Sequence, residues 1–186
     1  LHKFAERFAY HGIHPFRKMA LKKAEQWMLE RFEGSEGLAA IFPAMLNSVI
    51  ALKALGYSDT HPVLQREWQH LKNLQHETKD SVRIEPCFSP VWDSAIVLMC
   101  LRESGLSADD PRLKRAAEWI MAKEIRFRGD WHHKNPVDVE PSGWVFEYRN
   151  EWNPDVDDGI KVNLAPIART KLLRINLKLG ETNSED

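Results

Sequence analysis

The chain contains 186 residues, and its 26 lysines and arginines against 27 aspartates and glutamates give a net charge of −1. This length provides for one domain or for a piece of a larger one, because domains usually contain about 100–200 residues. The balanced charge argues against a nucleic-acid binder with a basic face, since such domains usually have a pI above about 9. The 43% hydrophobic and 28% charged residues are typical of a globular chain.

The cysteines and the apolar runs argue against a disulfide-rich protein and against a membrane-spanning segment. Cys87 and Cys100 are too few and too far apart for a disulfide framework or a CxxC motif, so we expect a reducing compartment. The longest apolar runs, residues 38–46 and 95–101, are much shorter than the roughly 18–20 residues that span a bilayer. The chain begins with Leu1 and no signal-peptide pattern follows, as in a fragment of a longer chain.

Five amphipathic helices are predicted before residue 125, because apolar residues recur there at three- to four-residue spacing. The predicted helices cover residues 16–32, 43–55, 61–74, 90–103 and 111–124. Gly56 and Gly105 follow apolar runs, and Pro62 and Pro111 stand near the starts of the next helices, as helix boundaries favour. No part of this stretch alternates as a strand would.

A shift of 49 residues superposes two parts of this helical region. The superposed pairs are Gly56 and Gly105, Ser58 and Ser107, Pro62 and Pro111, Leu64 and Leu113, and Arg66 and Arg115. This repeat indicates helical hairpins, which cannot bury both of their faces alone. Several hairpins must therefore stack into a solenoid or close into an α/α barrel. We expect an all-α chain that forms part of such an array.

The rest of the chain has a different character. Residues 126–154 have no helical period and are predicted to form a long structured loop, a kind of segment that is often functional. Residues 160–179 are expected to form a last helix, followed by a frayed tail. At the other end, a basic aromatic segment is expected either to contact a membrane surface or to pack on a neighbouring helix. Its apolar residues are Phe4, Phe8, Tyr10, Ile13 and Phe16.

Seven tryptophans are many for a chain of this length. Those expected to fill the cores of helix hairpins are Trp27, Trp68 and Trp119. Trp92, Phe146 and Trp152 lie instead beside turn-forming residues. Aromatic faces at such places can stabilise a cation by about 0.5–2 kcal/mol each. Core packing is an equal alternative for these three.

The densest group of ionisable residues is Asp155-Val156-Asp157-Asp158. Three carboxylates within four residues repel one another, so at least one tends to keep its proton near neutral pH. That property is what a general acid requires. The alternative is structural: Asp155 caps a helix whose first turn holds Asp157 and Asp158. The spacing alone favours the cap.

These acids do not match a metal motif. An EF-hand loop needs oxygens at its first, third and fifth positions before a glycine, whereas Asp158 and Gly159 directly follow Asp157. The magnesium motif of ionisation-type terpene synthases would need an acid at Lys161. The adjacent pair His132-His133 does not share a helix face and has no accompanying ligand spacing, so we take it as part of a loop. No metal is predicted.

Several motifs together carry a family resemblance. They are Cys87-Phe88-Ser89-Pro90-Val91-Trp92-Asp93, Gly129-Asp130-Trp131, Gly143-Trp144-Val145-Phe146-Glu147-Tyr148 and Pro154-Asp155-Val156-Asp157-Asp158. In this order and spacing they resemble the middle of a squalene-hopene cyclase, and Ile41-Phe42-Pro43-Ala44 fits the same family upstream. The match covers residues 1–158, and residues 159–186 are expected to be a divergent tail.

The resemblance implies a class II triterpene cyclase of hopanoid synthesis, with α/α barrels around an apolar cavity. Such enzymes dock on one membrane leaflet, here expected on the cytoplasmic side, and are usually dimeric. They cyclise squalene to hopene or hopanol without a metal or another cofactor. Asp157 would protonate the terminal alkene, while Asp155 and Asp158 would hold and polarise it. The cavity-lining residues implied by the resemblance are Trp92, Phe146 and Ile41.

The chain also departs from the family pattern. In the family's repeats, Phe32 replaces a glutamine and Leu38 a tryptophan in one copy, and Glu124 replaces a glutamine in another. The whole enzyme is much longer, so we expect this chain alone to be inactive, because partial walls cannot exclude water from a cation. Two alternatives remain: a class II cyclase of another isoprenoid, such as a prenyl diphosphate, and a non-catalytic helical-repeat interaction protein.

Overall fold

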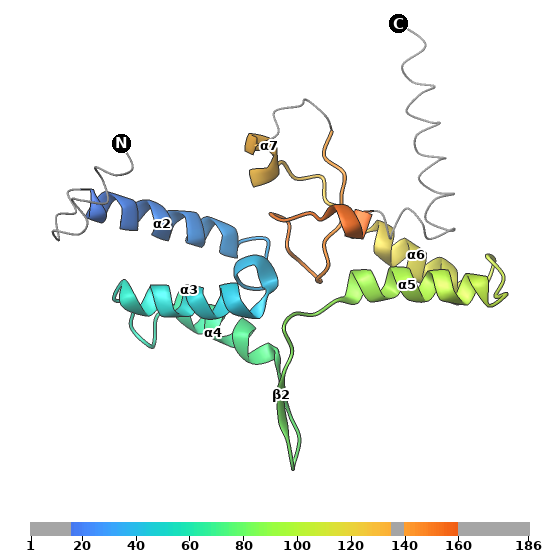
Figure 1. The fold of residues 1–186 in the computed structure, drawn as a ribbon, viewed down its shortest axis with the longest axis horizontal. Coiled ribbons are helices and arrows are strands. Elements are labelled where there is room, and N and C mark those ends of the chain that lie inside the picture. The colour runs from blue at the N-terminus through green and yellow to red at the C-terminus, as the bar shows by residue number, and fades with distance from the viewer. Residues whose placement is uncertain (1–15, 135–139, 160–186) are drawn as a thin grey trace, which may run out of the picture.

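A computed structural model describes residues 16–134 and 140–159 (Figure 1). Its longer helices are α2 (Arg17–Phe32), α3 (Phe42–Ala54), α4 (Pro62–Asn73), α5 (Pro90–Glu103) and α6 (Pro111–Met121). They confirm the five predicted helices, and only the end of α6 differs by more than one residue. Shorter elements are the 3-10 helix η1 (Leu38–Ala40), the strands β1 (Gln75–Glu77) and β2 (Val82–Ile84), and α7 (Asp130–Lys134).

The described helices pair as the repeat predicted, with α3 packed on α4 and α5 packed on α6 (Figure 1). Gly56 and Gly105 end the first helix of each pair with the same φ of +97°, a conformation that favours glycine. His61 and Asp110 then occupy equivalent positions, because each side chain accepts a hydrogen bond from the second helical residue. The 49-residue repeat is thus a repeat of helical hairpins.

Each hairpin has its own hydrophobic core. The core of the first contains the buried residues Phe32, Val49, Leu52 and Leu64, so α2 packs against α3 and α4. The core of the second contains Val91, Ala95, Leu98, Leu113, Ala117, Ile120 and Trp144. Trp144 belongs to the segment 140–159, which lies between the two hairpins in Figure 1. This segment therefore contributes directly to the core of the second hairpin.

The expectation that no strand occurs before residue 125 was wrong. β1 and β2 pair as an antiparallel hairpin that projects away from the helices (Figure 1). Its turn is closed by a 2.8 Å hydrogen bond from the Thr78 amide to the Ser81 carbonyl. The strands have three residues each, and almost all of their side chains are exposed. Such short strands without a buried face have no alternating apolar pattern to detect.

Two of the three tryptophans expected in the cores lie at the surface. Trp27 is 46% exposed and Trp68 is 42% exposed. Trp119 is half-buried and packs against the core of the second hairpin, while the buried indole of that core is Trp144. Helical spacing identifies the residues that share a face, but it does not tell which face the fold covers. The two tryptophans therefore could not be placed from periodicity alone.

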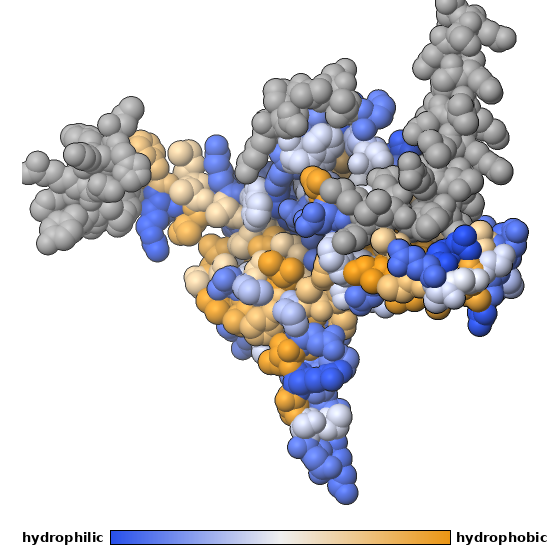
Figure 2. Space-filling view, turned by 45° about the vertical axis from the view of Figure 1, so that its right-hand side comes forward, coloured by the Kyte–Doolittle hydropathy of each residue, from blue (hydrophilic) through white to orange (hydrophobic). Residues whose placement is uncertain are grey.

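Several predictions lie outside the described residues, including the helix at 160–179, the tail and the aromatic residues before Phe16. Among the described residues, no helix combines the length and the apolar character needed to cross a membrane. Figure 2 shows exposed apolar side chains over α3 and α4. Ile50 of α3 and Trp68 of α4 are among the large apolar residues exposed there.

Candidate active site at the acid turn

The acid turn, residues 155–158, begins a helical turn. One side-chain oxygen of Asp155, Oδ1, accepts a hydrogen bond from the amide of Asp157 at 2.6 Å, and residues 156–159 are helical. The amide of Gly159 donates to the carbonyl of Asp155 at 3.2 Å. This geometry confirms the predicted cap, in which Asp155 satisfies a free amide of the first turn.

Trp144 fixes one side of the acid turn. The amide of Asp155 donates a 2.8 Å hydrogen bond to the carbonyl of Trp144, and the two residues form an antiparallel bridge. The indole of Trp144 is buried and its Nε1 donates to the carbonyl of Ile120 in α6 at 2.9 Å. The acid turn is thereby anchored to the core of the second hairpin.

The residues before the acid turn are bound to the segment that follows α2. The amide of Glu36 donates to the carbonyl of Arg149 at 3.1 Å, and the amide of Glu151 donates to the carbonyl of Gly34 at 3.0 Å. The side-chain amide of Asn150 donates to the carbonyl of Ala39 at 3.1 Å. The acid turn is thus held by the core of the second hairpin, through Trp144, and by the segment after α2, through residues 149–151.

Asp158 is the carboxyl of the turn that is shielded from water. It is 1% exposed, and neither of its carboxylate oxygens has a hydrogen-bond partner among the described residues. Burial, followed by the charges of Asp155, Glu147 and Asp157, raises the pKa of Asp158 to about 7. One acid of the turn therefore keeps its proton near neutral pH, as expected. Asp155 and Asp157 are exposed.

Glu147 is a buried acid that the sequence did not single out. Its carboxylate oxygen Oε2 accepts a 3.4 Å hydrogen bond from the side-chain amide of Asn150. Burial raises the pKa of Glu147 to about 6, and the charges of Glu36 and Asp155 add to the effect. Glu147 lies in the motif 143–148, beside Phe146, and an acid between aromatic residues was the one available signal.

The structure brings together two of the three predicted cavity residues. The rings of Trp92 in α5 and Phe146 in the loop lie with centroids 5.4 Å apart and planes tilted by 42°. Ile41 lies elsewhere, directly before α3, and is 40% exposed. The aromatic pair therefore joins the second hairpin to the loop that carries the acids.

A hollow of about 430 Å³ adjoins the acid turn. Its lining includes Asp155, Val156, Ile125, Phe127, Trp131 and Pro141. Trp92, Phe146 and Ile41 are not part of this lining. Within residues 16–134 and 140–159, no three histidine, cysteine, aspartate or glutamate side chains gather as a metal site would require. Among these described residues, the hollow brings the carboxyl of Asp155 together with the aromatic side chains of Phe127 and Trp131.

Fold and site together define an all-α protein of paired helices with a buried carboxyl, that of Asp158, whose pKa is raised to about 7 at a helical turn. Comparison with protein families gives this class its context. The squalene-hopene cyclase N-terminal domain model matches residues 1–80, and the C-terminal domain model matches residues 88–178. The two matches meet near β2, and the second continues beyond Asp158 into the predicted tail.

Individual relatives agree with the family models. A dammaradiene synthase from Dryopteris crassirhizoma is 41% identical over 83% of this chain and 22% of its own length. Squalene-hopene cyclases from Zymomonas mobilis and Alicyclobacillus acidocaldarius are 34% and 36% identical over 87% and 81% of this chain. The chain belongs to the squalene-hopene cyclase family. It spans about a quarter of the length of these relatives.

Proposed function

We propose that this chain provides the proton-donating part of a squalene-hopene cyclase, an isomerase that converts squalene to hopene or hopanol in hopanoid synthesis. The observation that supports this most is the acid turn, in which Asp158 is buried and its carboxyl has no hydrogen-bond partner within residues 16–134 and 140–159. A carboxyl in that state favours its protonated form. Protonation of an alkene requires such an acid in a site that excludes water.

Asp157 is assigned the proton transfer in this proposal. The family resemblance implies this role for Asp157, which is exposed among the described residues and directly precedes the enclosed Asp158. The walls that exclude water from Asp157 would come from the rest of the whole enzyme. The carboxyl O–H bond breaks, a C–H bond forms at the terminal alkene, and a tertiary carbocation and a carboxylate remain. In each ring closure the next alkene then forms a C–C bond to the cationic carbon, and the positive charge moves to a carbon of that alkene. Loss of a proton from the last cation gives hopene, and addition of water with loss of a proton gives hopanol.

Trp92 and Phe146 are assigned the stabilisation of the carbocation. Their rings form a tilted pair, so together they can present aromatic surface to one positive charge. Aromatic faces attract cations without acting as nucleophiles, which protects a reactive intermediate. Ile41 is assigned to the apolar wall, as the family resemblance implies.

The isolated chain is expected to be inactive. It covers about a quarter of the length of its relatives, and Asp155 and Asp157 are exposed. A carbocation formed there would react with water before the rings close. The test is incubation of the purified 186-residue chain with detergent-solubilised squalene, followed by gas chromatography with mass spectrometry. Detection of hopene or hopanol would overturn the expectation.

The catalytic assignment is tested in a chimera. Residues 16–159 replace the aligned segment of the Alicyclobacillus acidocaldarius enzyme, and squalene turnover is measured. We expect the chimera to form cyclised triterpenes and its Asp157→Asn variant to lose them while remaining folded. The matched control is Asp80→Asn, which neutralises an exposed aspartate in the β-hairpin turn and should leave turnover unchanged. Turnover by the Asp157→Asn chimera would contradict the assignment.

A second candidate function is that of a class II cyclase with another product or another isoprenoid substrate. A different product is favoured by the 41% identity to a dammaradiene synthase, which exceeds the identity to the two squalene-hopene cyclases. The same chimera is therefore supplied with squalene and with a prenyl diphosphate, and its products are compared. A folded chimera that converts neither substrate would favour the non-catalytic helical-repeat alternative, in which the acids only cap a helix.

We also propose peripheral association with the cytoplasmic side of a membrane. The support is α2 and its start, where Phe16, Met19 and Leu21 are exposed beside the basic residues Arg17 and Lys18. Apolar side chains flanked by basic ones favour the surface of an anionic bilayer. Flotation of the chain with anionic vesicles tests this, and a Phe16→Ser, Met19→Ser variant should float less.

A further inference from the structure

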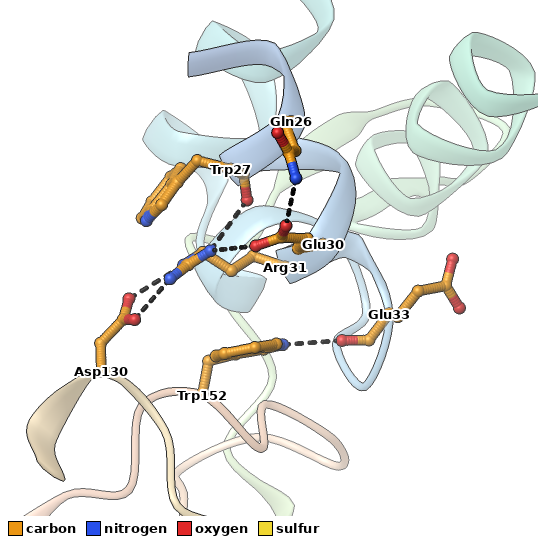
Figure 3. Close-up of polar contacts among 7 residues, drawn as sticks. All are labelled: Gln26, Trp27, Glu30, Arg31, Glu33, Asp130 and Trp152. Atoms are coloured by element: carbon orange, nitrogen blue, oxygen red, sulfur yellow. Dashed lines mark hydrogen bonds and ion pairs between the residues drawn. The ribbon is translucent and has the colours of Figure 1, made fainter. Parts of the chain in front are cut away.

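A buried arginine lies beside the loop that leads into the acid turn (Figure 3). Arg31 stands in the last turn of α2, and its side chain is 10% exposed. Its guanidinium carbon lies 4.2 Å from the ring centroid of Trp27 and 4.6 Å from that of Trp152. Figure 3 shows the guanidinium between the two indoles. Arg31 therefore joins α2 to the loop by cation–π contact on both sides.

The guanidinium is also paired with a carboxylate. Its Nε donates to Oδ2 of Asp130 at 2.9 Å, and its Nη2 donates to Oδ1 of the same residue. Its Nη1 donates to the carbonyl of Trp27 at 3.1 Å. This two-point pairing uses the planar fork that arginine has and lysine lacks. The buried charge is thus compensated, and its orientation is fixed by Asp130 at the start of α7.

Trp152 is held at its edge as well as at its face. Its Nε1 donates to the carbonyl of Glu33 at 2.8 Å, directly after α2 (Figure 3). The ring of Phe127 meets the indole edge-on with centroids 4.8 Å apart. The main chains also approach closely, because a Cβ placed on Gly129 would lie 3.1 Å from the Trp152 carbonyl oxygen. The position of Trp152 is determined by two segments of the chain, the end of α2 and residues 127–129.

Trp152 precedes the acid turn by three residues, and Asn153 and Pro154 are the only residues between them. The φ angle of Pro154 is fixed by its ring, so the position of Trp152 restricts the position of Asp155. On its other side, Asp155 is bound to Trp144. The acid turn is therefore supported by Trp144 on one side and by Trp152 on the other, and displacement of Trp152 would remove the second support.

We propose that Arg31 is a positioning residue for the acid turn: held between Trp27 and Trp152 and paired with Asp130, it fixes Trp152 and thereby the enclosure of Asp158. The inference rests on the proposed function for the role of the acid turn. Its geometry, however, predicts an effect on Asp158 that requires no turnover. Arg31 acts through Trp152 and does not contact the substrate.

The test measures the titration of Asp158 in the complete 186-residue chain. Aspartate side chains are labelled with carbon-13 at the carboxyl carbon, and the Asp158 signal is followed by NMR from pH 3 to pH 9. Arg31→Leu removes the guanidinium, and Trp152→Ala removes the indole that it contacts. In both variants we expect the midpoint for Asp158 to fall from about 7 toward the ordinary value of 3.8, because its enclosure opens. The double variant should show no further fall.

The matched control is Arg112→Leu. Arg112 also pairs at two points with an aspartate, Asp110, with distances of 3.1 and 2.9 Å, but it lies at the start of α6. This variant should leave the Asp158 midpoint unchanged. Circular dichroism verifies that each variant retains its helices, because unfolding would also expose Asp158 and lower its midpoint.

Two outcomes would overturn the inference. The first is an Asp158 midpoint that is the same in the unaltered chain and in a folded Arg31→Leu chain, or in Trp152→Ala. The second is an equal fall in Arg112→Leu, which would reveal general loosening. If Arg31→Leu does not fold, Arg31→Lys replaces it, because lysine keeps the buried positive charge but lacks the planar fork that pairs with Asp130 at two points. An unchanged midpoint in that variant would overturn the inference. An inactive chimera would contradict the proposed function and leave these titrations unaffected.

Discussion

The main-chain amide of Asp155 donates a hydrogen bond to the carbonyl oxygen of Trp144 at 2.8 Å. Trp144 is 2% exposed and is a member of the core between α5 and α6. The first acid of the turn is therefore placed by a residue whose side chain is part of a hydrophobic core. Changes in that core should reach the acids through this one bridge.

Replacement of Trp144 by phenylalanine tests the anchor. The variant loses the hydrogen bond from Nε1 to the carbonyl of Ile120 and part of the buried ring. We expect the free energy of unfolding to fall by about 1–3 kcal/mol, measured by urea denaturation followed by circular dichroism. The control is Trp68→Phe at an exposed indole, which should change it by less than about 0.5 kcal/mol. Equal effects of the two variants would contradict the role given to Trp144.

Two substitutions of Asp155 separate its cap from its charge. Asparagine can also cap a helix, so Asp155→Asn should keep the hydrogen bond to the Asp157 amide and leave stability nearly unchanged. Asp155→Ala should lower the free energy of unfolding by about 0.5–2 kcal/mol. Both remove a negative charge that raises the pKa of Asp158, so both should lower that pKa. Urea denaturation and carboxyl NMR measure the two effects, and an Asp155→Asn variant as unstable as Asp155→Ala would contradict the separation.

The pH dependence of stability should reveal Asp158. Its pKa is about 7 in the folded chain and near 3.8 when unfolded, so between these values the folded state binds the extra proton. Stability from this group is therefore present in acid, declines as pH rises from about 4 to about 7, and then stays level. Asp158→Asn removes this contribution and should be more stable than the unaltered chain at pH 8. A difference between the two chains that is constant from pH 4 to pH 8 would contradict the raised pKa.

The repeated helical hairpins could be predicted because local signals agree with the tertiary arrangement. Gly56 and Gly105 end helices, and Leu64 and Leu113, which are 49 residues apart, are both buried. Trp27 shows the limit of these local signals: its spacing correctly placed it in a helix, but the fold leaves its side chain partly exposed to solvent. The exposed strands β1 and β2 had no periodic pattern at all.

The acid turn and its roles were predicted from the spacing of the acids and from the family resemblance, but the burial of each acid was not. The sequence contains three equivalent carboxyls, and only the fold shows that Asp158 is enclosed while Asp157 is exposed. The partners of Arg31 were equally hidden, because Asp130 is 99 residues away along the chain. Phe32, which the family resemblance places at a glutamine position, is buried in the core of the first hairpin.

The segment after α2 offers a last test of how the loop is supported. Gly37 and Gly105 have similar φ values, +91° and +97°, which disfavour any residue with a Cβ. A Cβ at Gly37 would approach the side chain of Met45 to 2.9 Å, whereas nothing lies within 4 Å of one at Gly105. Gly105→Ala should therefore cost about 1 kcal/mol of unfolding free energy, and Gly37→Ala more, because it adds a clash in the core to the same strain.

Gly37 also lies within the segment that binds the loop, because Glu36 is hydrogen-bonded to Arg149 and Ala39 to Asn150. Gly37→Ala should therefore increase hydrogen exchange of the Glu151 amide, which is bound to the same segment. Gly105→Ala should leave that exchange unchanged. Equal exchange in the two variants would show that the segment after α2 does not support the loop.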